Sequence, residues 1–207
     1  STTKRHPGLM NSKISCDSNG FIKSIDFTGD FNTGAYASWG PTVANRVPVH
    51  ASGPYKVPNY QAIGRAIHTN GPIAGAFRGF GVPQATALQE TLMDQLADKL
   101  GIDQLEFRLQ NSLKDGDKTV CGQKLQSVGM IDCLKALKEN WKKNKEASIS
   151  FNKTSDRYKK GVGIATCWYG CGNTALPNPS TIKIALTNTG RISLHQGATD
   201  IGQGSNT

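Results

Sequence analysis

A leucine repeat between Gln84 and Leu100 constrains the fold of this 207-residue chain more than any other feature. Leucines recur there every four residues, so they line one side of a helix and require an apolar surface to pack against. Gly101 follows the last leucine and is suited to end the helix, while Pro83 suits a first helical turn. The sequence therefore predicts an amphipathic helix over residues 84–100.

The segment that leads into this helix, Gly75 to Gln84, combines three glycines with two phenylalanines and an arginine. Glycine lacks a Cβ and tolerates positive φ, so backbone amides in such a loop can approach a bulky ligand. The free N–H groups of a helix N-terminus favour negative charge. We therefore expect the loop to hold a flat, polar cofactor or substrate, although glycines before a helix also occur for purely steric reasons.

Strand patterns lie on both sides of this region. Asn19-Gly20 is a turn signal between alternating flanks, which predicts a hairpin over residues 13–27. A strand is expected over 62–69, and the Gly-, Pro-, Asn- and Ala-rich stretch 30–72 is expected to form short strands and loops. A second hairpin is predicted around Asn188-Thr189-Gly190.

The remaining segments carry weaker patterns. Asp103 can cap a second helix at about 104–113, and apolar spacing predicts a third helix over 131–140. The polar stretch 147–160 is expected to be a loop, and the apolar run 161–168 a strand. This mixture of separate strands and helices indicates an α+β fold.

Composition limits the class of protein. No apolar run approaches the length that spans a bilayer, and the N-terminus lacks the apolar stretch of a signal peptide, so no membrane association is expected. Five cysteines with wide spacing argue against a disulfide scaffold and for a reducing, cytoplasmic location. The only close pair, Cys167 and Cys171, lacks a zinc partner motif, and the four scattered histidines are interpreted as structural.

The net charge of +9 permits a nucleic-acid partner, but its arrangement does not favour one. The densest lysine cluster spans residues 135–145 and contains a single aromatic residue, Trp141. It is interpreted as a solvated helix face, with a basic, non-catalytic binding module as the alternative.

Five motifs in a fixed order carry a family resemblance. They are Lys4-Arg5-His6-Pro7, Tyr55-Lys56-Val57-Pro58-Asn59, Ala76-Phe77-Arg78-Gly79-Phe80-Gly81, Gly122-Gln123-Lys124-Leu125 and Gly202-Gln203-Gly204. Together they resemble the molybdenum-binding subunit of the xanthine dehydrogenase/aldehyde oxidase family of molybdenum hydroxylases. The resemblance implies parts of two molybdopterin-binding sub-domains, residues 1–125 and 126–207.

The resemblance also implies site residues. Arg46 matches a substrate-orienting arginine that stabilises developing negative charge, and it is the expected catalytic residue; its alternative is a surface arginine. Phe80 matches a phenylalanine that contacts an aromatic substrate. The expected cofactor-binding residues, with no side chain expected to ligate the metal, are Ala76, Phe77, Arg78, Gly202 and Gln203.

The implied cofactor is molybdenum–molybdopterin, with a cytosine dinucleotide tail as one option. Iron–sulfur [2Fe–2S] and FAD modules are expected on other domains or subunits. The implied reaction is oxidative hydroxylation of an aromatic N-heterocycle or an aldehyde. Gly172 or Asn173 replaces the phenylalanine that sandwiches purines, and Tyr169 can replace it only if the loop shifts, so the pattern is closer to enzymes that act on nicotinate-type heterocycles.

Two parts of the family's site are expected outside this sequence: a general-base glutamate beyond Thr207 and a Gly-rich loop before Ser1. The isolated chain is therefore expected to be inactive. It is interpreted either as a fragment of the subunit or as a natural split subunit that works with a partner chain.

Overall fold

The computed structural model describes residues 3–170, 179–200 and 204, and it divides into two compact units, residues 1–170 and 171–207. Helices and strands are mixed in the chain, which confirms the α+β class. The first unit contains β1 (Gly8–Cys16), β2 (Ile22–Gly34), α1 (Gly40–His50), β3 (Asn59–His68), α2 (Val82–Leu100), α3 (Gln104–Asn111), α4 (Met130–Ala136) and α5 (Lys138–Thr154). The second contains β4 (Lys183–Leu186) and β5 (Ile192–His195).

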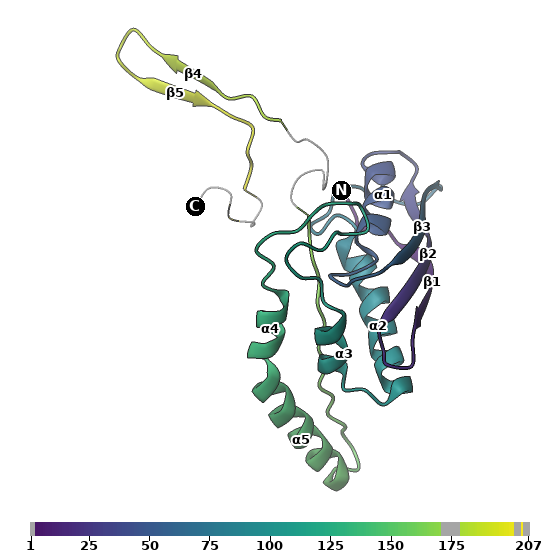
Figure 1. The fold of residues 1–207 in the computed structure, drawn as a ribbon. Coiled ribbons are helices and arrows are strands. Elements are labelled where there is room, and N and C mark those ends of the chain that lie inside the picture. The colour runs from purple at the N-terminus through teal and green to yellow at the C-terminus, as the bar shows by residue number, and fades with distance from the viewer. Residues whose placement is uncertain (1–2, 171–178, 201–203, 205–207) are drawn as a thin grey trace. The chain divides into compact units, whose positions relative to one another are not determined.

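The first unit is built on a sheet with the order β1-β2-β3 (Figure 1). The β1–β2 pair is antiparallel and turns at Gly20, where φ is +83°, which confirms the predicted hairpin. Strand β3 runs parallel to β2 and confirms the strand expected over 62–69. Because a parallel connection must cross over the sheet, the chain between β2 and β3 needs a connecting element.

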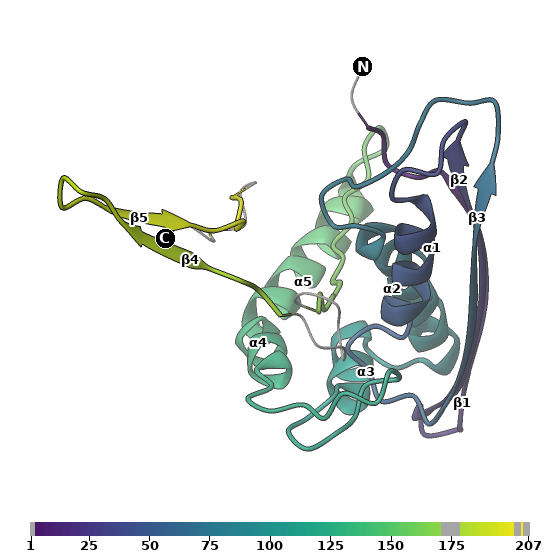
Figure 2. The same cartoon turned by 90° about the horizontal axis from the view of Figure 1, so that it is seen from above.

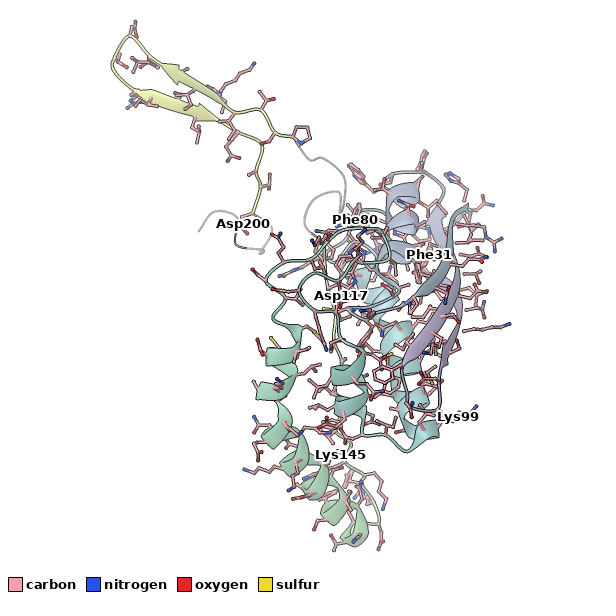
Figure 3. All side chains as sticks on the ribbon, viewed as in Figure 1. Phe31, Phe80, Lys99, Asp117, Lys145 and Asp200 are labelled. Carbon is pink, nitrogen blue, oxygen red and sulfur yellow. The ribbon has the colours of Figure 1, made fainter. Side chains whose placement is uncertain are left out.

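Helices α1 and α2 cover one face of this sheet, as Figure 2 shows from above. Alternate side chains of β2 point into the interface, where Phe27 and Phe31 are buried. Phe31 packs with Val47 of α1 and Ala85 of α2, and it is labelled in Figure 3. The core of the first unit therefore lies between β2 and these two helices.

Helix α2 confirms the helix predicted from the leucine repeat, with Pro83 in its first turn and Gly101 as its C-cap. The leucines nevertheless do not form the centre of the buried face of α2. Ala85, Met93 and Ala97 have no exposed surface, whereas Leu88 and Leu96 are only partly buried. Alanine brings the helix axis close to its neighbours, so the leucines fill the flanks of the contact.

Helix α1 corrects the expectation that residues 30–72 lack a helix. The segment contains Pro41 at its start and Pro48 within it, and the latter leaves the Ala44 carbonyl without its helical donor. Gly64 of β3 lies against that carbonyl, where an added Cβ would be only 2.3 Å from the Ala44 oxygen. Gly64 therefore lets the proline-containing helix pack directly on the sheet. This contact joins two distant segments, so the local sequence pattern does not predict it.

Helix α5 corrects a second expectation, since it continues to Thr154 through most of the predicted loop 147–160. The helix predicted over 131–140 is divided at Leu137, the C-cap of α4. Trp141 is the buried residue of α5, and its indole donates to the Asp103 carboxylate at 3.0 Å. The contact joins residues that are distant in sequence, so local patterns did not indicate it. The polar composition of α5 was therefore read as a loop.

Residues 161–168 were predicted as a strand, and this prediction is wrong for the described part of the chain. Val162, Ile164 and Thr166 alternate with more exposed neighbours, as in a strand, but the segment joins no ladder with a described strand. In the second unit, β4 and β5 pair antiparallel with Ile184 opposite Leu194, which confirms the second hairpin.

Candidate functional site

The loop before α2 has a left-handed backbone over three consecutive residues. The φ angles of Gly79, Phe80 and Gly81 are +91°, +46° and +96°. Gly81 is the N-cap of α2 and supplies no side-chain cap. An added Cβ there would lie 2.9 Å from Val47 and 3.1 Å from the Val43 oxygen of α1. This backbone path therefore requires glycine both for its torsions and for the space.

The N-terminal segment holds this loop in place. Lys4 forms a parallel bridge with Ala74, and the Gly75 N–H donates to the Lys4 carbonyl at 3.1 Å. Arg5 donates from Nη2 to the Arg78 carbonyl at 2.7 Å, and its guanidinium lies 4.6 Å from the centre of the Phe77 ring. Two motifs that are 70 residues apart in the sequence thus meet in one structure.

The loop presents its outer rim to solvent. Ala76, Phe77 and Arg78 are exposed, and Phe77 keeps 46% of its surface. The backbone N–H groups of Ala76 and Phe77 donate to none of the described residues. The half-buried Phe80, labelled in Figure 3, sets its ring edge-on to Trp39 at 6.1 Å. The loop therefore offers backbone donors, an aromatic ring and a guanidinium together.

Arg46 lies on α1, seven residues after Trp39, so about 10 Å of helix separates it from the end that Phe80 contacts. Its guanidinium donates to the Gly170 carbonyl and stands 5.2 Å from the centre of the Tyr169 ring. The structure therefore places Arg46 on α1 and Phe80 in the loop before α2, in separate clusters. Its predicted role in substrate binding stays a prediction.

His50 was interpreted as one of several scattered structural histidines, yet it organises the residues around Arg46. Its Nε2 accepts from the Gly170 N–H at 3.2 Å, and its Nδ1 lies 2.9 Å from the Arg46 carbonyl. Because a backbone N–H only donates, Nδ1 carries the ring proton. Burial lowers the pKa of His50 despite the opposing hydrogen bond to the Arg46 carbonyl, and the Arg46 charge lowers it further, which favours the neutral ring that accepts from Gly170. The signal that could have found it, an i, i+4 pair with Arg46, required α1 to be predicted.

A buried polar network lies under the site and includes the first residue of the Tyr55 motif. The Glu90 carboxylate accepts from the Tyr55 phenol at 2.8 Å, from the Thr166 N–H at 3.0 Å and from Arg108 Nε at 2.8 Å. Arg108 has no exposed surface and also pairs with Asp94 at 2.8 Å. Burial, followed by the Glu90 charge, raises the pKa of Tyr55 well above its ordinary value. The network fixes Thr166 and with it the segment that leads to Tyr169.

The other predicted features are placed as follows. Gly122-Gln123-Lys124-Leu125 follows a tight turn in which the Gly122 N–H donates to the Thr119 carbonyl, and Lys124 forms a bridge with Lys118 across that turn. Gly202 and Gln203 lie outside the described residues, as does Cys171. The other four cysteines are free thiols. Within the described part of the chain, no three His, Cys, Asp or Glu side chains gather as a metal site, and no helix is long and apolar enough to cross a membrane.

Comparison with known families gives two matches along the chain. The molybdopterin cofactor-binding domain matches residues 1–112, and a second molybdopterin cofactor-binding domain matches residues 135–207. The chain belongs to the molybdenum hydroxylase family. The family resemblance expected from the five motifs is thereby confirmed, whereas the division into sub-domains 1–125 and 126–207 stays a prediction.

Three curated relatives show the range of this family. The chain is 42% identical over 139 residues to the nicotinate dehydrogenase large molybdopterin subunit of Eubacterium barkeri, which covers 67% of the chain and 33% of the relative. It is 32% identical to the aldehyde oxidoreductase of Megalodesulfovibrio gigas, over 98% of the chain and 22% of the relative. A putative xanthine dehydrogenase molybdenum-binding subunit of Escherichia coli is 32% identical over the whole chain and 28% of the relative.

The fold agrees with a solved structure, the aldehyde oxidoreductase from Desulfovibrio gigas, at a TM-score of 0.83 and 32% identity. That comparison covers 93% of this chain and 21% of the other. The chain therefore spans between about a fifth and a third of the curated relatives named here.

The exposed rim of the loop fits the cofactor of this family. A pterin and its phosphate are rich in acceptor atoms, and the N–H groups of Ala76 and Phe77 are available donors beside the uncapped start of α2. The Arg5–Phe77 stack and the glycine torsions hold that rim in one conformation. The residues that are present are thus compatible with molybdopterin on one side of a site.

Proposed function

We propose that this chain is part of a molybdenum hydroxylase that hydroxylates an aromatic N-heterocycle. Its loop at residues 76–81 would form one wall of the cofactor site, with backbone groups of Ala76, Phe77 and Arg78 facing the pterin. The observation that carries the proposal is the left-handed run at residues 79–81, which exposes those backbone groups while α1 and the N-terminal segment hold the loop. Gly202 and Gln203 are also proposed to bind the cofactor, on the strength of the sequence motif alone.

The bound cofactor would supply the two-electron oxidation, in which one water oxygen enters the substrate and two electrons and two protons leave. This chain would bind and orient the substrate. Phe80 offers a half-exposed ring for a flat molecule. Arg46 carries a permanent charge that can hold a carboxylate or carbonyl and stabilise negative charge that develops on the ring.

The 42% identity to nicotinate dehydrogenase supports a pyridine-type heterocycle over a purine or an aldehyde. The partners would be iron–sulfur and flavin modules on other domains or subunits, which would accept the electrons. A direct test supplies the purified full-length protein with nicotinate, xanthine or an aliphatic aldehyde and a dye that accepts electrons. We expect a product heavier by one oxygen from nicotinate, and turnover of the aldehyde alone would contradict the proposal.

A division of the subunit between two chains is the second candidate. The relative at 42% identity is named as a large molybdopterin subunit, and the chain covers a greater share of it than of the other two relatives. In either arrangement the isolated 207 residues are expected to be inactive. Turnover by the isolated chain loaded with molybdenum cofactor would contradict the expected inactivity. A single reading frame that continues without interruption through the remaining motifs would exclude the division into two chains.

A further inference from the structure

The segment from Thr166 to Gly170 is fixed at both ends, although it belongs to no helix or sheet. Thr166 donates to Glu90 through both its N–H and its hydroxyl, at 3.0 Å each. Gly170 donates its N–H to His50 and accepts at its carbonyl from Arg46. The two residues between these anchors that carry large side chains, Trp168 and Tyr169, are therefore presented in a defined position beside α1.

Both aromatic residues contact the His50 ring, Trp168 in a tilted arrangement and Tyr169 in a stacked one. The Trp168 ring centre lies 4.5 Å from that of His50, and the Tyr169 ring lies 5.8 Å away at an interplanar angle of 23°. His50 itself is 3% exposed and uses both ring nitrogens in hydrogen bonds, so its orientation is fixed. The imidazole thus acts as a rigid platform for the two rings.

Tyr169 differs from its neighbours because it is fixed yet half exposed. Its ring keeps 51% of its surface although it contacts His50 and lies 5.2 Å from the Arg46 guanidinium. A ring that served only the core would be buried as Tyr55 is, at 1% exposed. An immobilised aromatic surface next to a permanent cation matches the two parts of a heterocyclic carboxylate, a flat ring and a negative charge.

We propose that Tyr169 is the aromatic wall against which a planar N-heterocyclic substrate stacks while Arg46 takes its carboxylate or carbonyl, and that His50 is the positioning residue for this pair. The inference deepens the function proposed above and rests on it for the identity of the reaction. The Tyr169 ring lies beside Arg46 without a shift of the loop, because the hydrogen bond from Gly170 to His50 holds the preceding residue next to α1.

The test uses the full-length holoenzyme with nicotinate and with an aliphatic aldehyde, which has no ring to stack. Tyr169→Ala and Tyr169→Leu remove the aromatic face, and the leucine retains apolar volume; Tyr169→Phe keeps the face. We expect the first two to raise KM for nicotinate about 3- to 10-fold, with kcat and the aldehyde KM within about 2-fold. Tyr158→Ala, a change at another exposed tyrosine, is the matched control.

The role of His50 is tested in the same assay. His50→Ala removes the acceptor for Gly170 and should reproduce the KM increase of Tyr169→Ala, whereas His50→Gln can retain a donor and an acceptor and should recover most of the affinity. Equal losses for nicotinate and aldehyde, or no loss in the Tyr169 variants, would overturn the proposal. A merely structural role for His50 would lower the thermal midpoint without separating the two substrates.

An equilibrium measurement separates this inference from the proposed function. Calorimetric titration of nicotinate into the full-length protein without turnover should give a Kd about 3- to 10-fold weaker in Tyr169→Ala. If the wild type binds nicotinate in this Tyr169-dependent way but does not hydroxylate it, the proposed reaction is wrong and the aromatic wall stands. If the protein hydroxylates nicotinate but neither binding nor turnover depends on Tyr169, the proposed reaction stands and the aromatic wall is wrong.

Discussion

The Tyr55 phenol donates a hydrogen bond of 2.8 Å to Oε1 of Glu90, in a site where both residues are almost fully buried. Glu90 belongs to α2 and Tyr55 to the segment before β3, so the bond joins two elements that meet only in the folded protein. The same carboxylate also receives Thr166 and Arg108. One acidic group thereby connects α2, α3 and the segment that presents Tyr169.

Tyr55→Phe should lower the free energy of unfolding by about 1.5–3 kcal/mol, because it deletes a buried hydrogen bond to a charged acceptor. Urea denaturation of the variant and the wild type measures the difference. Tyr158→Phe is the control, since its hydroxyl is on a ring that is 61% exposed and its change should stay within about 0.5 kcal/mol. Equal stabilities for Tyr55→Phe and wild type would show that the network does not stabilise the fold.

Arg46→Ala should reduce turnover of the full-length enzyme by about 10²–10³-fold, if its guanidinium stabilises charge that develops on the substrate. Steady-state kinetics with nicotinate measure the effect, and circular dichroism verifies that α1 remains folded. Arg65→Ala is the matched control, because Arg65 pairs with Asp30 on the exposed face of the sheet. Near-normal kinetics for Arg46→Ala would remove this residue from the site.

Gly81→Ala should destabilise the loop more than Gly122→Ala does. Both glycines have left-handed torsions, with φ of +96° and +82°, so each alanine incurs about 1–2 kcal/mol of backbone strain. At Gly81 the new Cβ would also meet Val47 at 2.9 Å, whereas nothing lies within 4 Å at Gly122. Thermal midpoints and cofactor content of the two variants give the comparison, and equal losses would show that contact with α1 is unimportant for the loop.

Asp103 should contribute to stability in a pH-dependent way. Partial burial acts to raise the pKa of Asp103, but hydrogen bonds from Lys145, Trp141 and two backbone N–H groups outweigh it and lower that pKa below its ordinary value. A carboxylate with a lowered pKa stabilises the fold above its unfolded pKa of about 3.9 and loses this contribution as pH falls through the folded pKa. The loss is therefore expected below about pH 4.

The Asp103→Asn variant isolates this effect, because asparagine can still cap α3 but does not titrate. Far-UV circular dichroism between pH 6 and pH 2 should show an acid loss of helix in the wild type that is smaller in the variant, which starts from a lower stability. Identical acid transitions would assign the sensitivity to other carboxylates, such as Asp117 with its Lys56 partner.

Local patterns were sufficient for much of the secondary structure and for the family. The helix over 84–100 and both hairpins were predicted because periodicity and turn chemistry act over a few residues. The loop at residues 75–84 was predicted to use the positive φ that glycine tolerates, and the φ values of Gly79 and Gly81 agree, while its role in holding a ligand stays a prediction. The five motifs identified the family because each retains its order and spacing along the chain.

Other features depended on contacts between distant residues, and local patterns do not report these. Helix α1 exists despite Pro48 because Gly64 of another strand makes room for the displaced carbonyl. Helix α5 is polar along its length and is tied down by Asp103, 38 residues before Trp141. For the same reason His50 looked like an isolated histidine until the fold brought Gly170, Trp168 and Tyr169 to it.

The sequence by itself thus determined the protein family to which this chain belongs and the positions of its amphipathic helix and hairpins, since these follow from residue type and spacing. The tertiary structure alone decided which groups surround Arg46, which donors the Glu90 carboxylate accepts from and which aromatic ring lies beside the guanidinium. Those outcomes depend on the burial of charge and on close packing between elements, where hydrogen-bond geometry over a few ångströms decides which side chains meet.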